Sequence, residues 1–243
     1  MAKKHFTMLE NNPEVMNKLA HDLGLSPKFG FHDIYSLTDP DLLAFIPRPA
    51  LALLVIIPLT PTWDEARIAE DKDQADYEGC GESEPTIWFK QTIGDACGSI
   101  GLVHCCLNGE VFKHVTPGST LDQIRTEALP KKMLERAKVL EDSEAFEKAH
   151  GDAAVLGDTK PPDKKEHEHT GQHFVAFVKG KDGHLWELEG SRKGPLDRGT
   201  LKEDEDVLSE AALEMGLGRL MKIETENGGD LRFSAIALAE NFA

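Results

Sequence analysis

The stretch that decides the fold is Gln91-Thr92-Ile93-Gly94-Asp95-Ala96-Cys97-Gly98-Ser99-Ile100-Gly101. Gly94 and Asp95 are turn residues, and the segment from Cys97 to Leu107 that follows them is predicted to be a helix. A thiol at the N-terminus of a helix meets the positive end of the helix dipole, which lowers its pKa and favours the thiolate. The thiolate is the form that attacks a carbonyl carbon, so Cys97 is a candidate nucleophile. A single cysteine is more often an inert core residue, and a nucleophile needs partners.

Three further side chains are candidate partners of Cys97. His173 begins a β-prone run, so its ring can lie at the rim of a sheet as a general base. Glu189 follows the second strand of a predicted hairpin, from where its carboxylate can hydrogen-bond the imidazole and hold one tautomer. Gln91 can donate its side-chain amide to an oxyanion, beside the backbone N–H of Cys97. Each also has a plainer interpretation, as a half-exposed histidine, a strand-end carboxylate or a surface glutamine.

The rest of the chain alternates between helical and extended patterns. Asn12 followed by Pro13 is typical of a helix start, and apolar residues then recur at helical spacing up to Gly24. Further helices are predicted after Asp39-Pro40, from the capping pair Ser119 and Asp122 to Ala149, and over 204–221. Strands are predicted over 51–57, 86–89, 174–178, 185–188 and 231–238, with a tight hairpin turn at Lys181-Asp182-Gly183. The strand over 51–57 is apolar throughout, so it should be buried between two neighbouring strands.

Two segments are rich in charge. Residues 151–171 combine small residues, Pro161-Pro162 and a run of charged side chains, with neither helical nor extended periodicity. We expect them to form a mobile loop. Residues 64–84 contain nine acidic side chains against Arg67 and Lys72. We expect this second segment to form a solvated face.

Composition and charge limit the possible functions. The chain has 243 residues, 40% of them hydrophobic, and no internal repeat or long linker divides it, which favours one large domain. A formal net charge of -16 opposes binding to nucleic acid or anionic membranes and favours a basic partner. Solubility alone is the other explanation of this acidic excess. We therefore expect a single domain, residues 1–243, that binds neither nucleic acid nor membrane.

The same composition bears on location and on metals. The longest apolar run, Ala50 to Ile57, is shorter than the roughly 20 residues of a membrane-spanning helix, and no hydrophobic stretch follows the basic start as in a secretory signal. Four cysteines without CxxC spacing fit reduced thiols in the cytosol. The histidines show no paired Cys/His ligand spacing. These features predict a protein of the cytoplasm, with the nucleus as a second compartment, that holds no metal.

The string from Gln91 to Gly101 resembles the active-site signature of the ubiquitin C-terminal hydrolases, the papain-like cysteine proteases of peptidase family C12. The resemblance extends over nearly the whole chain. Further stretches similar to this family are Asn12-Pro13-Glu14-Val15, Pro47-Arg48-Pro49, His173-Phe174, Leu185-Trp186-Glu187-Leu188 and Leu231-Arg232-Phe233-Ser234-Ala235-Ile236-Ala237-Leu238. The resemblance implies a deubiquitinating thiol protease that hydrolyses (iso)peptide, ester or thioester bonds at the C-terminal glycine of ubiquitin.

The family gives the candidate residues a common meaning. It implies that Cys97 is the nucleophile, His173 the general base and Gln91 the oxyanion donor. It implies an α+β, papain-like fold in which helices flank a mainly antiparallel sheet and the chain path is knotted. No cofactor and no metal are implied, and nothing in the sequence demands more than a monomer.

The resemblance also implies which segments contact ubiquitin. The first lies before and at the start of the first helix, and comprises Met8, Leu9, Glu10, Asn11, Asn12 and Pro13. The second lies in residues 151–171, which would be a crossover loop over the active site that limits released groups to small adducts or short extensions. Its implied contacts are Asp152, Ala153, Ala154, Val155 and Leu156. The third is the last strand, with Asp230, Leu231, Arg232, Phe233, Ser234 and Ala235.

Two positions depart from the family pattern. Glu189 occupies the position of the third catalytic residue, an aspartate in the family, and its side chain is one methylene longer. Asp95 stands where the family usually has asparagine, and puts a negative charge beside the thiolate, although it can also cap the helix. We expect activity at a reduced rate. The alternatives are a catalytically impaired ubiquitin-binding protein of the same fold and a hydrolase for a ubiquitin-like modifier.

Overall fold

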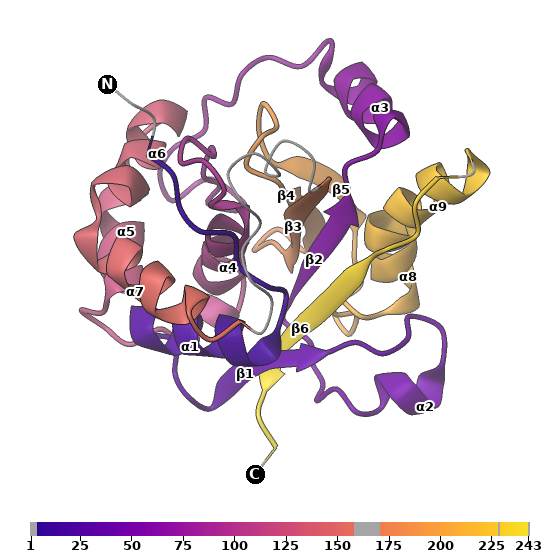
Figure 1. Cartoon of the computed structure of the whole chain (residues 1–243), viewed down its shortest axis with the longest axis horizontal. Helices are drawn as coiled ribbons and strands as arrows, with labels where there is room; N and C mark the ends of the chain where they lie inside the picture. The colour runs from indigo at the N-terminus through magenta and orange to yellow at the C-terminus, as the bar shows by residue number, and fades with distance from the viewer. Residues whose placement is uncertain (1–3, 158–170, 228, 243) are drawn as a thin grey trace.

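A six-stranded antiparallel sheet crosses the middle of the molecule, and helices cover both of its faces (Figure 1). The computed structural model describes residues 4–157, 171–227 and 229–242. The strand order is β1-β6-β2-β3-β4-β5, and all neighbouring pairs are antiparallel. The strands are β1 (Phe29–Asp33), β2 (Ala52–Pro58), β3 (Gln172–Lys179), β4 (His184–Leu188), β5 (Leu196–Thr200) and β6 (Ser234–Glu240). The predicted α+β class and antiparallel sheet are confirmed, and the knot stays a prediction.

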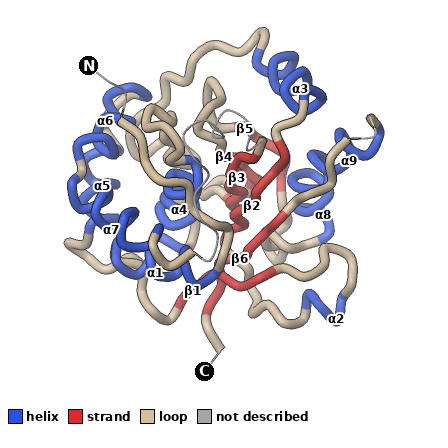
Figure 2. The backbone as a smooth tube through the Cα atoms, viewed as in Figure 1, coloured by secondary structure: helices blue, strands red, loops and turns tan. Residues whose placement is uncertain are grey.

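The helices form two groups on opposite sides of the sheet. Helices α1, α4, α5, α6 and α7 lie on one side, and α3, α8 and α9 lie on the other (Figure 2). The helices are α1 (Pro13–Leu23), α2 (Pro40–Leu43), α3 (Pro61–Asp71), α4 (Cys97–Leu107), α5 (Thr120–Ala128), α6 (Met133–Asp142), α7 (Glu144–Ala154), α8 (Glu210–Leu213) and α9 (Arg219–Glu226). A 3-10 turn η1 (Val111–His114) and a π-helical turn η3 (Glu214–Gly218) complete the described elements.

Strand β2 is buried on both faces, as its unbroken apolar sequence predicts. Leu54 and Ile56 belong to the hydrophobic cluster beneath α1 and α4, whereas Val55 and Ile57 belong to the cluster beneath α3 and α8. Strands β6 and β3 pair with its two edges. Ile57 lies opposite His173 in this register, so the start of β3 and the start of α3 meet at the same end of the sheet.

The first helix and the hairpin follow their sequence signals. Asn12 caps α1, because its side-chain oxygen accepts a hydrogen bond from Glu14 N at 2.8 Å. Gly24 ends the helix with a φ of 114°, in the left-handed region that favours glycine. The predicted tight turn joins β3 to β4, and Gly183 has a φ of 81° there. These local patterns are confirmed.

The prediction of a strand over 86–89 is wrong. These residues are buried, but their backbone groups pair with side chains of α4 and its C-cap rather than with a strand. Asn108 accepts from Ile87 N at 2.7 Å and donates to Ile87 O at 3.0 Å, and His104 Nε2 accepts from Phe89 N at 2.9 Å. The extended sequence therefore satisfies its backbone without joining the sheet.

The acidic segment 64–84 is not simply a solvated face, contrary to the prediction. The first part of this segment, up to Asp71, belongs to helix α3. Thr60 caps this helix, because its side chain accepts from Trp63 N at 3.0 Å. Asp71 and Glu84 are buried, and each is paired with an arginine from a distant part of the chain. A buried carboxylate is tolerated when it is paired in this way. Composition alone does not show such pairing.

The predicted helical region from Ser119 consists of three helices; Ser119 is the N-cap residue as predicted, but its predicted side-chain bond is missing and the predicted end is wrong. Ser119 makes no side-chain cap bond, and Asp122 instead accepts from Gly118 N at 2.7 Å. Helix α7 continues past Gly151 to Ala154, because its backbone ladder tolerates a single glycine. The remainder of the predicted loop, residues 158–170, lies outside the described residues.

Two boundaries in the last part of the chain also differ from the prediction. Residues 204–209 are not helical. The helix begins after Ser209, which caps it because its Oγ accepts from Ala212 N at 3.3 Å. The last strand begins at Ser234 and extends to Glu240. Both elements exist as predicted, with shifted ends.

Candidate active site

Helix α4 begins at Cys97, which places the thiol at the helix N-terminus as predicted. Ala96 occupies the position before the helix and makes no side-chain cap hydrogen bond. Asp95 has a φ of 59°, in the left-handed region that aspartate and asparagine tolerate better than most residues. Its carboxylate lies 3.5 Å from Nδ1 of His5. The positive end of α4 therefore faces the Cys97 thiol.

Helix α4 packs closely against the start of β3. A Cβ on Gly98 would lie 3.1 Å from the ring of Phe174, so glycine favours this approach. The side chain of His173 and the backbone of Phe174 are neighbouring groups that act on the Cys97 thiol. Burial acts to raise the pKa of the Cys97 thiol, but the hydrogen bond and charge of His173 outweigh it and lower that pKa. These interactions favour the thiolate form of Cys97, which is a partly buried residue.

His173 lies between Cys97 and Glu189. Its Nε2 is 2.5 Å from Oε1 of Glu189, so Nδ1 is the ring nitrogen left for the thiol. Burial acts to lower the pKa of His173, but the charge of Glu189 and the contact with Cys97 raise it to about 10. A lowered thiol pKa beside a raised imidazole pKa favours a thiolate–imidazolium pair at neutral pH.

Glu189 reaches His173 although its side chain is one methylene longer than aspartate. The residue is 1% exposed, and the same Oε1 also accepts from Ser191 N at 2.7 Å. Burial acts to raise the pKa of Glu189, but the charge of His173 and these hydrogen bonds lower it to about 2. Its backbone carbonyl accepts from Trp88 Nε1 at 3.1 Å. The carboxylate is therefore charged and held at two points.

Gln91 lies on the approach to α4, near the loop that carries Glu189. Its backbone N–H donates to Gly190 O at 2.8 Å, and its side-chain Nε2 donates to Ile93 O at 3.3 Å. The second bond is longer than the roughly 2.9–3.0 Å typical of such bonds, so a developing oxyanion can compete for this amide. The position suits an oxyanion donor.

The structure brings together the three segments that the family resemblance links to ubiquitin. Asn11 Nδ2 donates to Ser234 O at 3.1 Å, which joins the N-terminal segment to the last strand. A Cβ on Gly157 would lie 3.1 Å from Glu10, so the segment after α7 meets the N-terminal segment too.

Two of the residues in these segments are placed differently from the expectation. Leu9 is 7% exposed and Ala153 is fully buried, so both pack in the core and do not present side chains to a partner. Ala153 is buried because α7 continues through it. Val155 and Leu231 are exposed at 80% and 54%. Together with Leu156, which is 38% exposed, they are exposed apolar side chains of these segments.

Sequence reasoning missed a contribution from α3. The ring of Trp63 lies 6.3 Å from the ring of His173, centroid to centroid. The signal was present, because Thr60-Pro61 repeats the cap-and-proline pattern that correctly located α1 at Asn12-Pro13. The acidic composition after Trp63 led to the prediction of a solvated face, so this helix was not predicted.

The described residues contain no group of three or more His, Cys, Asp or Glu side chains placed to hold a metal ion. Within the same described ranges, none of the helices has the length and apolar content needed to cross a membrane.

Comparisons with known proteins agree with this geometry. The family described as ubiquitin carboxyl-terminal hydrolase, family 1, matches residues 6–221. Ubiquitin carboxyl-terminal hydrolase 3 of Arabidopsis thaliana is 34% identical over 241 residues, covering 98% of this chain and 96% of the relative. A ubiquitin carboxyl-terminal hydrolase of Aplysia californica is 37% identical over 206 residues, covering 84% of this chain and 90% of the relative.

A solved structure shares the fold. The catalytic domain of Trichinella spiralis UCH37, bound to ubiquitin vinyl methyl ester, matches with a TM-score of 0.74 and 21% identity, covering 100% of this chain and 98% of that one. At this identity the match shows the fold alone. With the family match over residues 6–221 and relatives above one third identity, the chain belongs to family 1 of the ubiquitin carboxyl-terminal hydrolases.

Proposed function

We propose that this protein hydrolyses bonds at the C-terminal glycine of ubiquitin, with Cys97 as the nucleophile. The observation that carries the proposal is the chain of contacts from Cys97 through His173 to Glu189 at the N-terminus of α4. Relatives that are 34% and 37% identical carry the name of this activity. We further propose that residues 1–243 act as one catalytic domain and as a monomer, in the cytoplasm with the nucleus as a second compartment.

The reaction is acyl transfer through a thioester. The thiolate of Cys97 attacks the glycine carbonyl carbon, and the backbone N–H of Cys97 and the amide of Gln91 stabilise the oxyanion. The imidazolium of His173 gives its proton to the leaving amine as the C–N bond breaks. His173 then takes a proton from water, which hydrolyses the thioester and releases ubiquitin. Glu189 keeps the ring oriented throughout, and no step requires a metal or an organic cofactor.

The three joined segments support the proposed position of ubiquitin. The exposed side chains of Val155 and Leu231 offer apolar contact on two of them. The net charge of -16 suits the basic C-terminal tail of ubiquitin. The segment 151–171 would limit the leaving group to small adducts or short extensions, so folded conjugates should be cleaved much more slowly.

Hydrolysis of a fluorogenic C-terminal amide of ubiquitin tests the proposal. We expect turnover by the wild type and none by Cys97→Ala, with ubiquitin binding retained in both. His114→Ala, at a histidine in η1 outside the contact chain, is a matched control that should keep its rate.

Two other outcomes would contradict the proposal. Binding of ubiquitin without turnover by the wild type would identify a binding protein with a protease fold. Faster turnover of a ubiquitin-like modifier than of ubiquitin, each supplied as the same tail-labelled amide, would identify a different substrate.

A further inference from the structure

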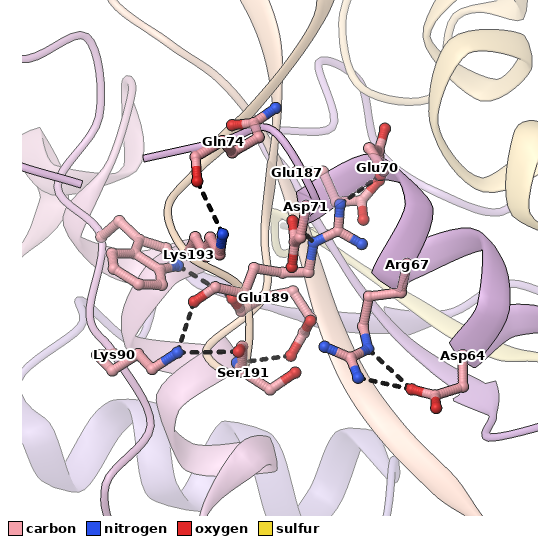
Figure 3. A network of polar contacts seen from close by, with 12 residues as sticks. Asp64, Arg67, Glu70, Asp71, Gln74, Lys90, Glu187, Glu189, Ser191 and Lys193 are labelled. Carbon is pink, nitrogen blue, oxygen red and sulfur yellow. Dashed lines mark hydrogen bonds and ion pairs between the residues drawn. The ribbon is translucent and has the colours of Figure 1, made fainter. Parts of the chain in front are cut away.

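Residues 189–194, here called the Glu189 loop, connect β4 to β5 and are held by hydrogen bonds along their length. Figure 3 shows Lys90 and Ser191 beside Glu189. The carbonyl of Gly190 accepts from Gln91 N at 2.8 Å, and that of Lys193 accepts from Tyr77 N at 2.9 Å. The carbonyls of Ser191 and Arg192 both accept from Nζ of Lys90, at 2.9 and 2.7 Å. The Nζ of Lys193 donates in turn to Gln74 O at 2.8 Å. The loop is therefore fixed by main-chain contacts on both sides of Arg192.

Arg192 is the buried anchor of the Glu189 loop. It is 3% exposed, its guanidinium pairs with Glu70, and its Nε lies 3.1 Å from Oδ1 of Asp71. Both carboxylates belong to the C-terminal end of α3. Water competes little for a buried ion pair, so its geometry is fixed more firmly than that of an exposed pair. Helix α3 thus sets the position of Arg192.

One face of α3 contacts His173 directly and the Glu189 loop through Arg192. Trp63, Glu70 and Asp71 recur at the spacing of one helix face, i, i+7 and i+8. Trp63 packs beside the ring of His173, whereas Glu70 and Asp71 hold the Glu189 loop through its arginine. Glu70 also pairs with Arg198 at 2.5 Å, which ties the same cluster to β5. The helix is therefore a common support for the imidazole and the carboxylate.

We propose that Arg192 is a positioning residue, which fixes the Glu189 loop on α3 so that the carboxylate of Glu189 stays in contact with His173. Glu189 has one more rotatable bond than an aspartate, so it loses more rotamer freedom when it is held in contact. A fixed backbone and the Ser191 N–H supply that constraint. Only the kinetic assay with ubiquitin rests on the proposed function. Alkylation of Cys97 reports on the Cys97–His173 pair without any substrate.

The test uses variants in a Cys80→Ser background, because Cys80 is an exposed free thiol that would also react. Arg192→Met removes the charge and keeps the bulk, and Arg192→Lys restores a cation. Arg48→Met is the control for the loss of an ion-paired arginine, at a more exposed position (46% of the side chain exposed, against 3% for Arg192). Arg48 forms an ion pair with Asp206. It precedes β2 at the Ala52 end of the strand, whereas His173 lies opposite Ile57 at the other end. Each variant is measured for the pH midpoint of Cys97 alkylation by iodoacetamide, for thermal unfolding, and for kcat and KM on ubiquitin amide.

In Arg192→Met we expect kcat to fall about 100-fold with KM unchanged, because a misplaced catalytic group costs rate rather than binding. The alkylation midpoint should rise toward the roughly 8.5 of a free thiol, because a misaligned Glu189 no longer sustains the imidazolium. Arg192→Lys should recover part of both effects. Arg48→Met should lower the unfolding temperature and change neither kcat nor the midpoint.

The inference is overturned if Arg192→Met lowers only the unfolding temperature, as the control does, or if Arg192→Lys recovers nothing. Asp71→Asn weakens the anchor from the α3 side and serves if Arg192→Met does not fold. It should shift the alkylation midpoint in the same direction, and an unchanged midpoint contradicts the inference. If ubiquitin amide is not hydrolysed by any variant while the midpoint still shifts, the proposed function fails and the positioning role stands.

Discussion

Replacing Glu189 by glutamine removes the charge that faces His173 and keeps the length of the side chain. In the wild type, Oε1 of Glu189 lies 2.5 Å from Nε2 of His173. Although burial opposes the change, the pKa of His173 is raised from 6.5 to about 10. At about 1.4 kcal/mol for each pKa unit, this rise corresponds to roughly 5 kcal/mol of preference for the imidazolium. The charge of Glu189 is the largest of the contributions that raise this pKa, ahead of those of Cys97. We take a loss of about 2.5 kcal/mol as the working magnitude for Glu189→Gln.

A loss of about 2.5 kcal/mol corresponds to a rate reduction of about 70-fold, so kcat/KM of Glu189→Gln on ubiquitin amide should fall by about that factor. The alkaline decline of activity, expected near pH 10 in the wild type, should move to lower pH because the pKa of His173 falls. The pH profile of kcat/KM is the measurement. Unchanged activity together with an unchanged alkaline decline would refute the role of Glu189.

The shorter variant Glu189→Asp tests the geometry of the same contact. Removing one methylene withdraws the carboxylate by about 1.5 Å, the length of one C–C bond. The contact that now measures 2.5 Å would open to about 4 Å, since the Glu189 loop is held in place. We expect a smaller loss of kcat/KM than in Glu189→Gln. Faster turnover than the wild type would show that the longer carboxylate is a handicap.

Three further predictions concern the oxyanion, the ubiquitin surface and stability. Gln91→Ala should lower kcat on ubiquitin amide by about 10²–10³-fold with little change in KM, and an effect on KM alone would contradict its role as oxyanion donor. Val155→Glu should raise KM while kcat stays constant, because Val155 is 80% exposed, whereas Leu134→Glu, at a 65% exposed position on α6, should change neither constant. The raised pKa of His173 contributes stability that is complete below pH 6.5 and is lost as the pH rises through about 10, so the unfolding temperature of the wild type should fall over that window more than that of His173→Gln.

Local signals in the sequence were sufficient for the elements nearest the site. The turn at Gly94 and the start of α4 at Cys97 follow from residue types within a few positions, as does the hairpin that ends at Leu188. The contact between His173 and Glu189 depends on sheet register and on the backbone after β4. The sequence predicted that both side chains lie at strand ends. It did not predict that they are in contact, because the distance between them is set by the folded sheet.

The features that could not be predicted depend on pairing across the chain. Arg192 and the acids of α3 lie about one half of the chain apart, and each looks like a solvated surface charge in the sequence. The buried run over 86–89 looks like a strand, because its partners Asn108 and His104 are helical side chains rather than another strand. In both cases the local sequence is the same whether these polar groups are hydrated or are paired with each other.

Trapping the nucleophile with ubiquitin that bears a C-terminal vinyl methyl ester tests the central claim most directly. The measurement is peptide mass spectrometry of the adduct, with the exposed thiol of Cys80 as an internal control. We predict one ubiquitin attached to Cys97, none attached to Cys80, and loss of the adduct in Cys97→Ala and His173→Ala. An adduct on Cys80, or none on Cys97 while ubiquitin binds, would contradict the account.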